Sequence, residues 1–256
     1  MSDTHIHVDN LTMAYGANLI QSDLTFDVKH GDVFIIMGGS GCGKSTLLKH
    51  MIGLFLPASG DILYDGLSFA QATEEQQFQM RRSWGITYQS GGLFSAMTLA
   101  QNTALPLQQY TELKAGEIAD IVAYKLALVG LGGFQEYYPS EISGGMQKRA
   151  ALARAIALDP QILFFDEPSA GLDPISSQLL DELIVEMKES LGATVVIVTH
   201  ELASIFAIAT NSVFLDADSK TMIDYGDPRQ LVTQSRHDKV RRFLSRGNTQ
   251  AQGDRP

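Results

Sequence analysis

The chain has 256 residues, of which 45% are apolar, enough to bury the core of one compact domain or of a domain with an attached lobe. Its formal net charge of -10 argues against a nucleic acid as the main partner, because an excess of Lys and Arg is needed to neutralise a phosphate backbone. A single cysteine, Cys42, excludes an internal disulfide, and no apolar run approaches the roughly 20 residues that cross a bilayer. We expect a cytoplasmic chain that would work at a membrane only as a peripheral subunit.

The first third of the chain contains β-rich segments at residues 5–11, 24–28 and 61–64, the last followed by the turn signal Asp65-Gly66. We expect these segments to form a small antiparallel layer. Short apolar runs at residues 33–37, 162–166 and 194–198 alternate with helical patterns, which is typical of a parallel sheet with crossover helices.

The pattern from about residue 98 to residue 158 is helical, with its best segments at residues 117–129 and 146–158. We interpret residues 90–158 as a helical lobe inserted into the sheet domain. A β-like segment at 221–225, a helix after Pro228 and a helix at 238–245 follow. We expect one domain over residues 1–246 and a mobile tail over 247–256.

A glycine-rich motif follows the apolar run at 33–37 and precedes a helical pattern, and it satisfies G-x-x-x-x-G-K-[ST]. Its glycines let successive backbone N–H groups surround a phosphate at a helix N-terminus. Lys44 would reach the β- and γ-phosphates of a nucleotide, and Ser45 would bind Mg²⁺. Cys42 needs only to be small there, although a reactive thiol is the alternative. The phosphate-binding residues are predicted to be Gly38, Gly39, Ser40, Gly41, Cys42, Gly43, Lys44, Ser45 and Thr46.

Two acids end the apolar run at 162–166. Asp166 stands where a P-loop site holds Mg²⁺ and its waters. Its neighbour Glu167 could accept a proton from the attacking water, with a helix-terminal acid as the alternative interpretation. His200 follows the run at 194–198 and is a candidate contact for the γ-phosphate, or else a packing residue.

The segment Ser143-Gly144-Gly145, which lies one Ala-rich helix before Asp166, resembles the signature motif of ABC ATPases. The resemblance extends over nearly the whole chain and departs from the usual pattern at Ile142 and Met146. It implies an α/β P-loop NTPase fold with a RecA-like parallel-sheet core, an antiparallel β layer and an inserted helical lobe. In this family Tyr15 would stack on adenine, Gln89 would be the Q-loop glutamine, Asp173 would belong to the D-loop and His200 would be the switch histidine.

The same resemblance implies a homodimer, because a signature motif forms half of an anion site that a second copy completes with its P-loop. ATP and Mg²⁺ would be the cofactors, with Ser45, Gln89 and Asp166 as metal ligands. Glu167, His200, Gln89 and Lys44 would carry the hydrolysis.

The chain is most similar to the ATPases of MCE-type phospholipid transporters, which maintain outer-membrane lipid asymmetry, in three segments: Gln89 to Thr98, Ser143 to Arg149 and Ser169 to Pro174. This resemblance implies a position on the cytoplasmic face of the bacterial inner membrane. The implied partners are an integral-membrane permease dimer, a periplasmic MCE protein and a regulator with a STAS domain, and no nucleic acid.

Three alternatives stay open at this stage. The chain could energise the transport of another solute, because the chemistry of ATP is common to all ABC transporters. It could be an ABC regulator outside transport, although it has one nucleotide domain and a strongly acidic balance. It could bind nucleotide without turnover, against which the presence of Glu167 is the discriminating feature.

Overall fold

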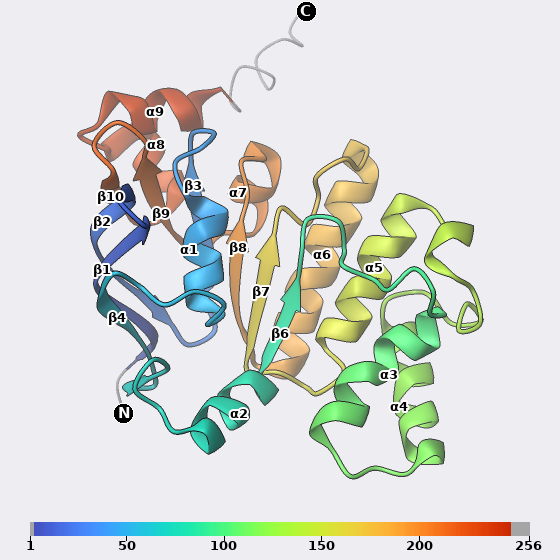
Figure 1. Cartoon of the computed structure of the whole chain (residues 1–256). Helices are drawn as coiled ribbons and strands as arrows, with labels where there is room; N and C mark the ends of the chain where they lie inside the picture. The colour runs from blue at the N-terminus through green and yellow to red at the C-terminus, as the bar shows by residue number, and fades with distance from the viewer. Residues whose placement is uncertain (1–2, 247–256) are drawn as a thin grey trace, which may run out of the picture. The chain divides into compact units, whose positions relative to one another are not determined.

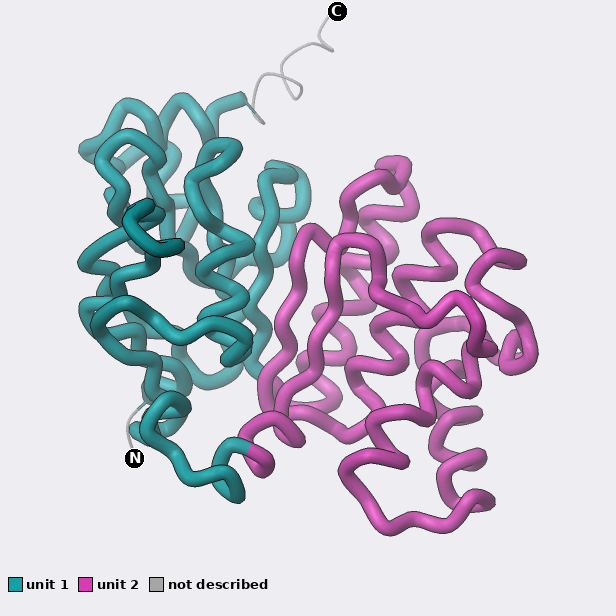
Figure 2. Tube along the Cα trace, in the orientation of Figure 1, with its two compact units in different colours: residues 1–77, 194–256 teal, residues 78–193 magenta. Residues whose placement is uncertain are grey.

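The computed structural model of the chain describes residues 3–246. Two compact units make up the fold, one of residues 1–77 with 194–256 and the other of residues 78–193 (Figure 2). The tail predicted to be mobile, residues 247–256, lies outside the described residues.

An antiparallel layer in the first unit has the strand order β2-β1-β4-β5 (Figure 1). Its first two strands are longer than the segments predicted at 5–11 and 24–28, and each contains a residue with positive φ. Asn10 in β1 has φ 46° and Asp23 in β2 has φ 55°. The buried alternation resumes beyond Asn10, which is typical of a β-bulge. The strands are β1 (Thr4–Tyr15), β2 (Asn18–Lys29), β4 (Ser59–Tyr64) and β5 (Leu67–Ser68).

A second set of strands in this unit has the order β10-β9-β3-β8. The central strand β3 runs parallel to β8 and to β9, and β10 pairs antiparallel with β9. All residues of β3 and β8 are buried, which explains why both segments are continuous apolar runs in the sequence. The elements are β3 (Val33–Gly38), β8 (Thr194–Val198), β9 (Asn211–Asp216), β10 (Thr221–Tyr225), α1 (Lys44–Met51), α7 (Leu202–Ile208), α8 (Pro228–Gln234) and α9 (Asp238–Ser245).

The second unit contains a parallel strand pair and most of the helices. In it, β6 (Trp84–Thr87) pairs with β7 (Ile162–Asp166). The helices are α3 (Leu99–Tyr110), α4 (Ala115–Leu128), α5 (Gly144–Ala155) and α6 (Pro174–Leu191), with a 3-10 turn at Pro139–Glu141. Helix α2 (Glu74–Arg82) carries the chain from the first unit into the second.

Parallel pairing fixes where the loops of each unit meet. The carboxyl ends of β3 and β8 lie at one edge in the first unit, and those of β6 and β7 lie at one edge in the second. Ligands of open α/β sheets bind at such edges. The glycine-rich loop follows β3, Gln89 lies just beyond β6, the two acids are at the end of β7, and His200 lies just beyond β8.

Candidate functional site

The glycine-rich loop begins at the end of β3 and ends where α1 starts at Lys44 (Figure 1). Two of its glycines are required by the backbone. A Cβ on Gly38 would meet the carbonyl oxygen of Leu215 at 2.3 Å, and Gly43 is the left-handed N-cap of α1 with φ 98°. The ammonium of Lys44 donates to the carbonyl oxygens of Gly38 and Gly39, each at 3.0 Å. The loop therefore has the compact form and the helix-terminal position of a phosphate cradle.

Gln21 on β2 forms a hydrogen bond to this loop, a contact that the sequence did not indicate. Its fully buried amide donates to the carbonyl oxygen of Cys42 at 2.7 Å and to that of Asp216 at 2.9 Å. Gln21 thus links the loop to the end of β9.

The thiol of Cys42 is 1% exposed, and burial raises its pKa even though Lys44 acts in the opposite direction. A raised pKa disfavours the reactive thiolate. The side chain is therefore a buried packing group, and the backbone N–H of Cys42 donates to the carbonyl oxygen of Gly39 at 3.4 Å.

Two further predicted site residues belong to the unit that carries the loop. Tyr15 ends β1, is 48% exposed and meets the ring of Phe55 edge-on at 5.7 Å. His200 lies two residues beyond β8, which pairs in parallel with β3, so His200 and the loop are at the same edge. An exposed aromatic ring and an exposed imidazole thus accompany the phosphate loop.

The predicted acids lie in the second unit, at the end of β7. Thr87 of β6 pairs with Phe165 of β7, which places Gln89 and the acids at one edge of the strand pair. Glu167 has φ 48°, a conformation rarely adopted by a residue with a side chain, and it is 9% exposed. Strained backbone of this kind is concentrated at functional sites because the surrounding fold maintains it.

Helix α5 holds the loop that contains Gln89. Lys148 donates its ammonium to the carbonyl oxygen of Gln89. Burial lowers the pKa of Lys148, while the carboxylates of Glu167 and Asp166 oppose this shift. Arg154, six residues further along the helix, donates to the carbonyl oxygens of Gly92 and Gly91 at 2.8 and 3.1 Å.

Asn102 of α3 fixes the other end of the same loop. Its fully buried side chain accepts a hydrogen bond from the N–H of Phe94 at 2.8 Å. It also donates to the carbonyl oxygens of Phe94, Met97 and Thr98 at 3.0 to 3.1 Å. The segment from Gln89 to Thr98 is therefore held by side chains from two helices.

The signature segment forms the start of α5. Ser143 is the N-cap, and its Oγ accepts from the N–H of Met146 at 3.3 Å. Ser143 and Gly144 are exposed, so this helix end presents backbone N–H groups on the surface of the second unit.

Asp173 caps α6 in the same unit. Its carboxylate accepts from the N–H groups of Ile175 and Ser176 and from the hydroxyl of Ser176. The hydroxyl of Ser176 is the main cause of its lowered pKa. The sequence-predicted D-loop aspartate thus has a structural task at a helix end.

The predicted residues divide between the units. The first carries Tyr15, the phosphate loop and His200, and the second carries Gln89, the acids, the signature segment and Asp173. The predicted Mg²⁺ ligands Ser45, Gln89 and Asp166 all offer oxygen atoms, the donors that this ion prefers, so the donor set fits the metal.

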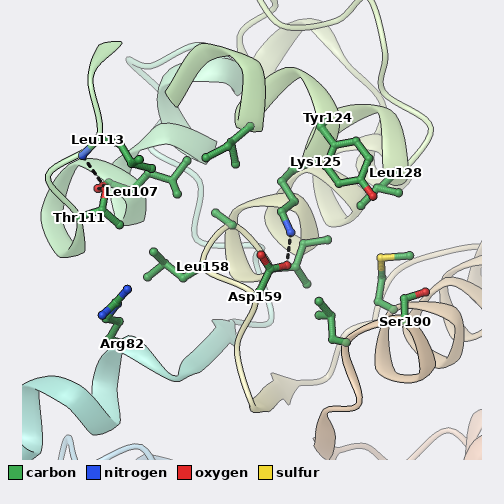
Figure 3. Close-up of a pocket in the computed structure, with 15 residues that line it drawn as sticks. Arg82, Leu107, Thr111, Leu113, Tyr124, Lys125, Leu128, Leu158, Asp159 and Ser190 are labelled. Atoms are coloured by element: carbon green, nitrogen blue, oxygen red, sulfur yellow. Dashed lines mark hydrogen bonds and ion pairs between the residues drawn. The ribbon is translucent and has the colours of Figure 1, made fainter. Parts of the chain in front are cut away.

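The second unit also contains a cavity of about 500 Å³ (Figure 3). Its walls are largely aliphatic, and no predicted nucleotide-site residue lines it. Lys125 of α4, whose side chain is 4% exposed, extends to Asp159 beyond α5 and forms an ion pair of 2.5 Å. The cavity carries a charge pair within an apolar wall.

None of the helices within residues 3–246 is long and apolar enough to span a membrane.

Comparison with known proteins gives consistent results. Residues 21–170 match the family model described as ABC transporter. The chain is 42% identical over 240 residues to the probable ribonucleotide transport ATP-binding protein mkl of Mycobacterium leprae, covering 94% of this chain and 68% of that protein. It is 41% identical over 244 residues to the intermembrane phospholipid transport system ATP-binding protein MlaF of Haemophilus influenzae. The match covers 95% of this chain and 91% of that protein. MlaF of Escherichia coli K12 is 38% identical, with coverage of 93% and 88%.

Solved structures resemble the chain along most of its length. CbiO1 of Clostridium perfringens, part of the ABC transporter complex cbiONQ, gives a TM-score of 0.82 at 28% identity and covers 98% of both chains. The dimeric post-hydrolysis state of the ATP-binding cassette MJ0796, bound to ADP and Pi, gives 0.77 at 27% identity, covering 86% of this chain and 97% of that one.

Proposed function

Since this chain belongs to the ABC transporter family, as an ATP-hydrolysing subunit, we propose that it energises phospholipid transport across the Gram-negative envelope. Movement of phospholipid between the two membranes would maintain the lipid asymmetry of the outer membrane. The ATPase chemistry is common to the family, and the lipid substrate is the specific part of the proposal.

The observation that carries the lipid assignment is the similarity to MlaF, which covers about nine tenths of both proteins. The segment from Gln89 to Thr98 supports it, because Arg154 and Asn102 bind five of its carbonyl oxygens and fix its shape. A loop held in this way can transmit a defined motion to a partner.

In the proposed mechanism, two copies of the chain bind ATP between them, as the dimeric state of MJ0796 suggests. The P-loop of one copy would hold the phosphates together with Ser143 of the other. Lys44 would leave its two carbonyl partners for the β- and γ-phosphates, and Tyr15 would stack on adenine. Ser45, Asp166 and Gln89 would hold Mg²⁺, which neutralises phosphate charge when it is bound.

Glu167 would take the proton of the attacking water, and His200 would contact the γ-phosphate. Phosphate release would then let the dimer open. Because Lys148 binds Gln89 and Arg154 binds Gly92, a movement of α5 would move this loop as well. The permease would receive the motion there.

The partners in this proposal are a permease dimer in the inner membrane, a periplasmic MCE protein and a STAS-domain regulator. The chain would work at the cytoplasmic face, held there by its permease.

Affinity purification of the tagged chain from detergent-solubilised membranes of its native host, followed by mass spectrometry, tests the proposal. Recovery of a permease together with an MCE protein supports phospholipid transport. Recovery of a permease without any MCE protein overturns the lipid assignment and leaves the ATPase assignment intact. The printed name of mkl makes ribonucleotide transport the second candidate, which uptake of labelled nucleotide by the reconstituted complex would support.

A further inference from the structure

Three side chains of types that can bind a metal ion lie together in the first unit, at the antiparallel layer. His5 is in β1, His30 is in the turn after β2, and Asp65 is in the turn after β4. One ligand atom from each lies within 4.8 Å of the others. No residue of this cluster belongs to the predicted nucleotide site.

From this arrangement, we propose that His5, His30 and Asp65 form a binding site for a transition-metal ion of the Zn²⁺ class. Two imidazoles and a carboxylate are the ligands that such ions accept, and three protein ligands leave a position for water.

The distances are close to those that a bound ion requires. The Nε2 of His30 lies 2.8 Å from Oδ1 of Asp65, and the Nε2 of His5 lies 3.8 Å from Oδ2. Tetrahedral coordination with bonds near 2.1 Å separates ligand atoms by about 3.4 Å, which falls between these values. Each pair is within 1 Å of that spacing, His30 through Oδ1 and His5 through Oδ2 of the Asp65 carboxylate.

The backbone already fixes the three residues relative to one another. The N–H of Asp65 donates to the carbonyl of His5 at 2.9 Å, and the N–H of His30 donates to that of Asp3 at 3.0 Å. The site thus draws one ligand from each of three segments that hydrogen bonds hold side by side, so little chain entropy is lost on binding.

His5 is the fixed member of the set. It is 4% exposed, and its Nδ1 hydrogen-bonds to Oγ1 of Thr194 at 2.7 Å. Thr194 also accepts from the N–H of Gly31 at 3.0 Å, which holds its hydroxyl in place. A hydrogen bond to the second ring nitrogen is the usual support of a metal-binding histidine, and it leaves Nε2 for the ion.

His30 and Asp65 are the adjustable members, with side chains 48% and 57% exposed. The rings of His5 and His30 stack with centroids 4.0 Å apart and an interplanar angle of 14°. Because nitrogen lone pairs lie in the ring plane, the His30 ring must rotate on binding. Its exposure permits this rotation.

Nearby charges favour a cation. The hollow around the cluster, about 650 Å³ in volume, is also lined by His7 and Asp27, which bind each other at 2.7 Å. The neighbouring cation Lys29 is paired with Asp3 at 2.9 Å.

The test is a titration of the untagged, nucleotide-free chain with ZnCl₂ by calorimetry, together with thermal melting at each metal concentration. We expect one Zn²⁺ per chain, a raised melting temperature, and affinity at least about tenfold weaker in His30→Gln and in Asp65→Asn. Both variants change exposed side chains, and circular dichroism checks that they are folded. His237→Gln, at an exposed histidine outside the cluster, is the matched control and should keep the wild-type affinity.

Absence of binding to the wild-type chain would overturn the proposal. Equal affinity in the wild type and in His30→Gln would do so as well, as would an equal loss in His237→Gln. Titration with Co²⁺ adds an independent readout, because the visible absorption bands of the wild type and the control should require at least about tenfold more Co²⁺ in His30→Gln.

Discussion

The guanidinium of Arg154 donates through Nη1 to the carbonyl oxygen of Gly92 at 2.8 Å and through Nη2 to the carbonyl oxygen of the preceding residue, Gly91, at 3.1 Å. Arg154 lies in the helix that begins with the signature segment, and Gly92 lies in the loop that begins with Gln89. Arg154 therefore connects helix α5 directly to the loop that follows Gln89 within the second unit.

Replacing Arg154 with Met should separate these two parts. Loss of hydrogen bonds from a charged donor should cost about 1.5 to 3 kcal/mol of unfolding free energy. Displacement of Gln89 should lower kcat for ATP about tenfold or more. Urea denaturation and steady-state ATPase assays measure both effects, with Arg236→Met as an exposed control. A variant with wild-type kcat would show that the loop keeps its position without Arg154.

Gln21→Met should weaken ATP binding through the P-loop. The substitution preserves volume but removes both donors to the buried carbonyls of Cys42 and Asp216. We expect a destabilisation of about 1 to 3 kcal/mol and a higher Kd for ATP. Fluorescent-nucleotide titration provides the measurement, and Gln230→Met on the surface provides the control. An unchanged Kd would mean that the loop holds its shape alone.

Removing Lys125 and removing Asp159 from the ion pair in the cavity of Figure 3 should lower the unfolding free energy by different amounts. Asp159→Asn tolerates the left-handed backbone, φ 50°, but leaves the ammonium of Lys125 within an apolar wall. It should cost about 1 to 3 kcal/mol, whereas Lys125→Met should be nearly neutral because Asp159 can remain hydrated. Chemical denaturation measures the unfolding free energy of both variants. A larger destabilisation in Lys125→Met than in Asp159→Asn would contradict this prediction.

Asp216 should make stability depend on acid pH. Its burial alone would raise its pKa, but hydrogen bonds from Lys239 and Ser219 outweigh this and hold the pKa at about 2. A carboxyl with a depressed pKa stabilises the fold above its unfolded pKa near 3.8, and this contribution is lost as pH falls toward 2. Lys239→Met should lower the denaturation midpoint at pH 7, and the difference should close near pH 2. A difference that is constant with pH would exclude Asp216 as its source.

The sequence predicted the parts of the fold that depend on local pattern. The strands β3, β7 and β8 appear in it as apolar runs because they are buried almost throughout, and the P-loop follows from glycine spacing. The short strand β6 was not predicted, since its four residues include Gly85 and lack a clear pattern.

The supporting contacts of the candidate site could not be predicted. Gln21, Asn102 and Arg154 each bind backbone carbonyls, and the first and last reach residues 21 to 195 positions away in sequence. Such bonds depend on tertiary placement, and a polar residue in a strand or helix gives no sign of its partner. The predicted segments 5–11 and 24–28 were too short, because β1 continues beyond Leu11 and β2 begins before Asp23, whose positive φ is typical of a turn.

The most direct test of the account is sedimentation of Glu167→Gln with and without ATP, beside its ATPase rate. Glutamine keeps the shape of the side chain but cannot accept the proton, so the rate should fall by about 10² to 10⁴. The uncleaved ATP should then hold two copies together, and adding Ser143→Arg should return the chain to monomers that still bind ATP. An undiminished rate, or a monomer at saturating ATP, would contradict a catalytic Glu167 in a nucleotide-sandwiched dimer.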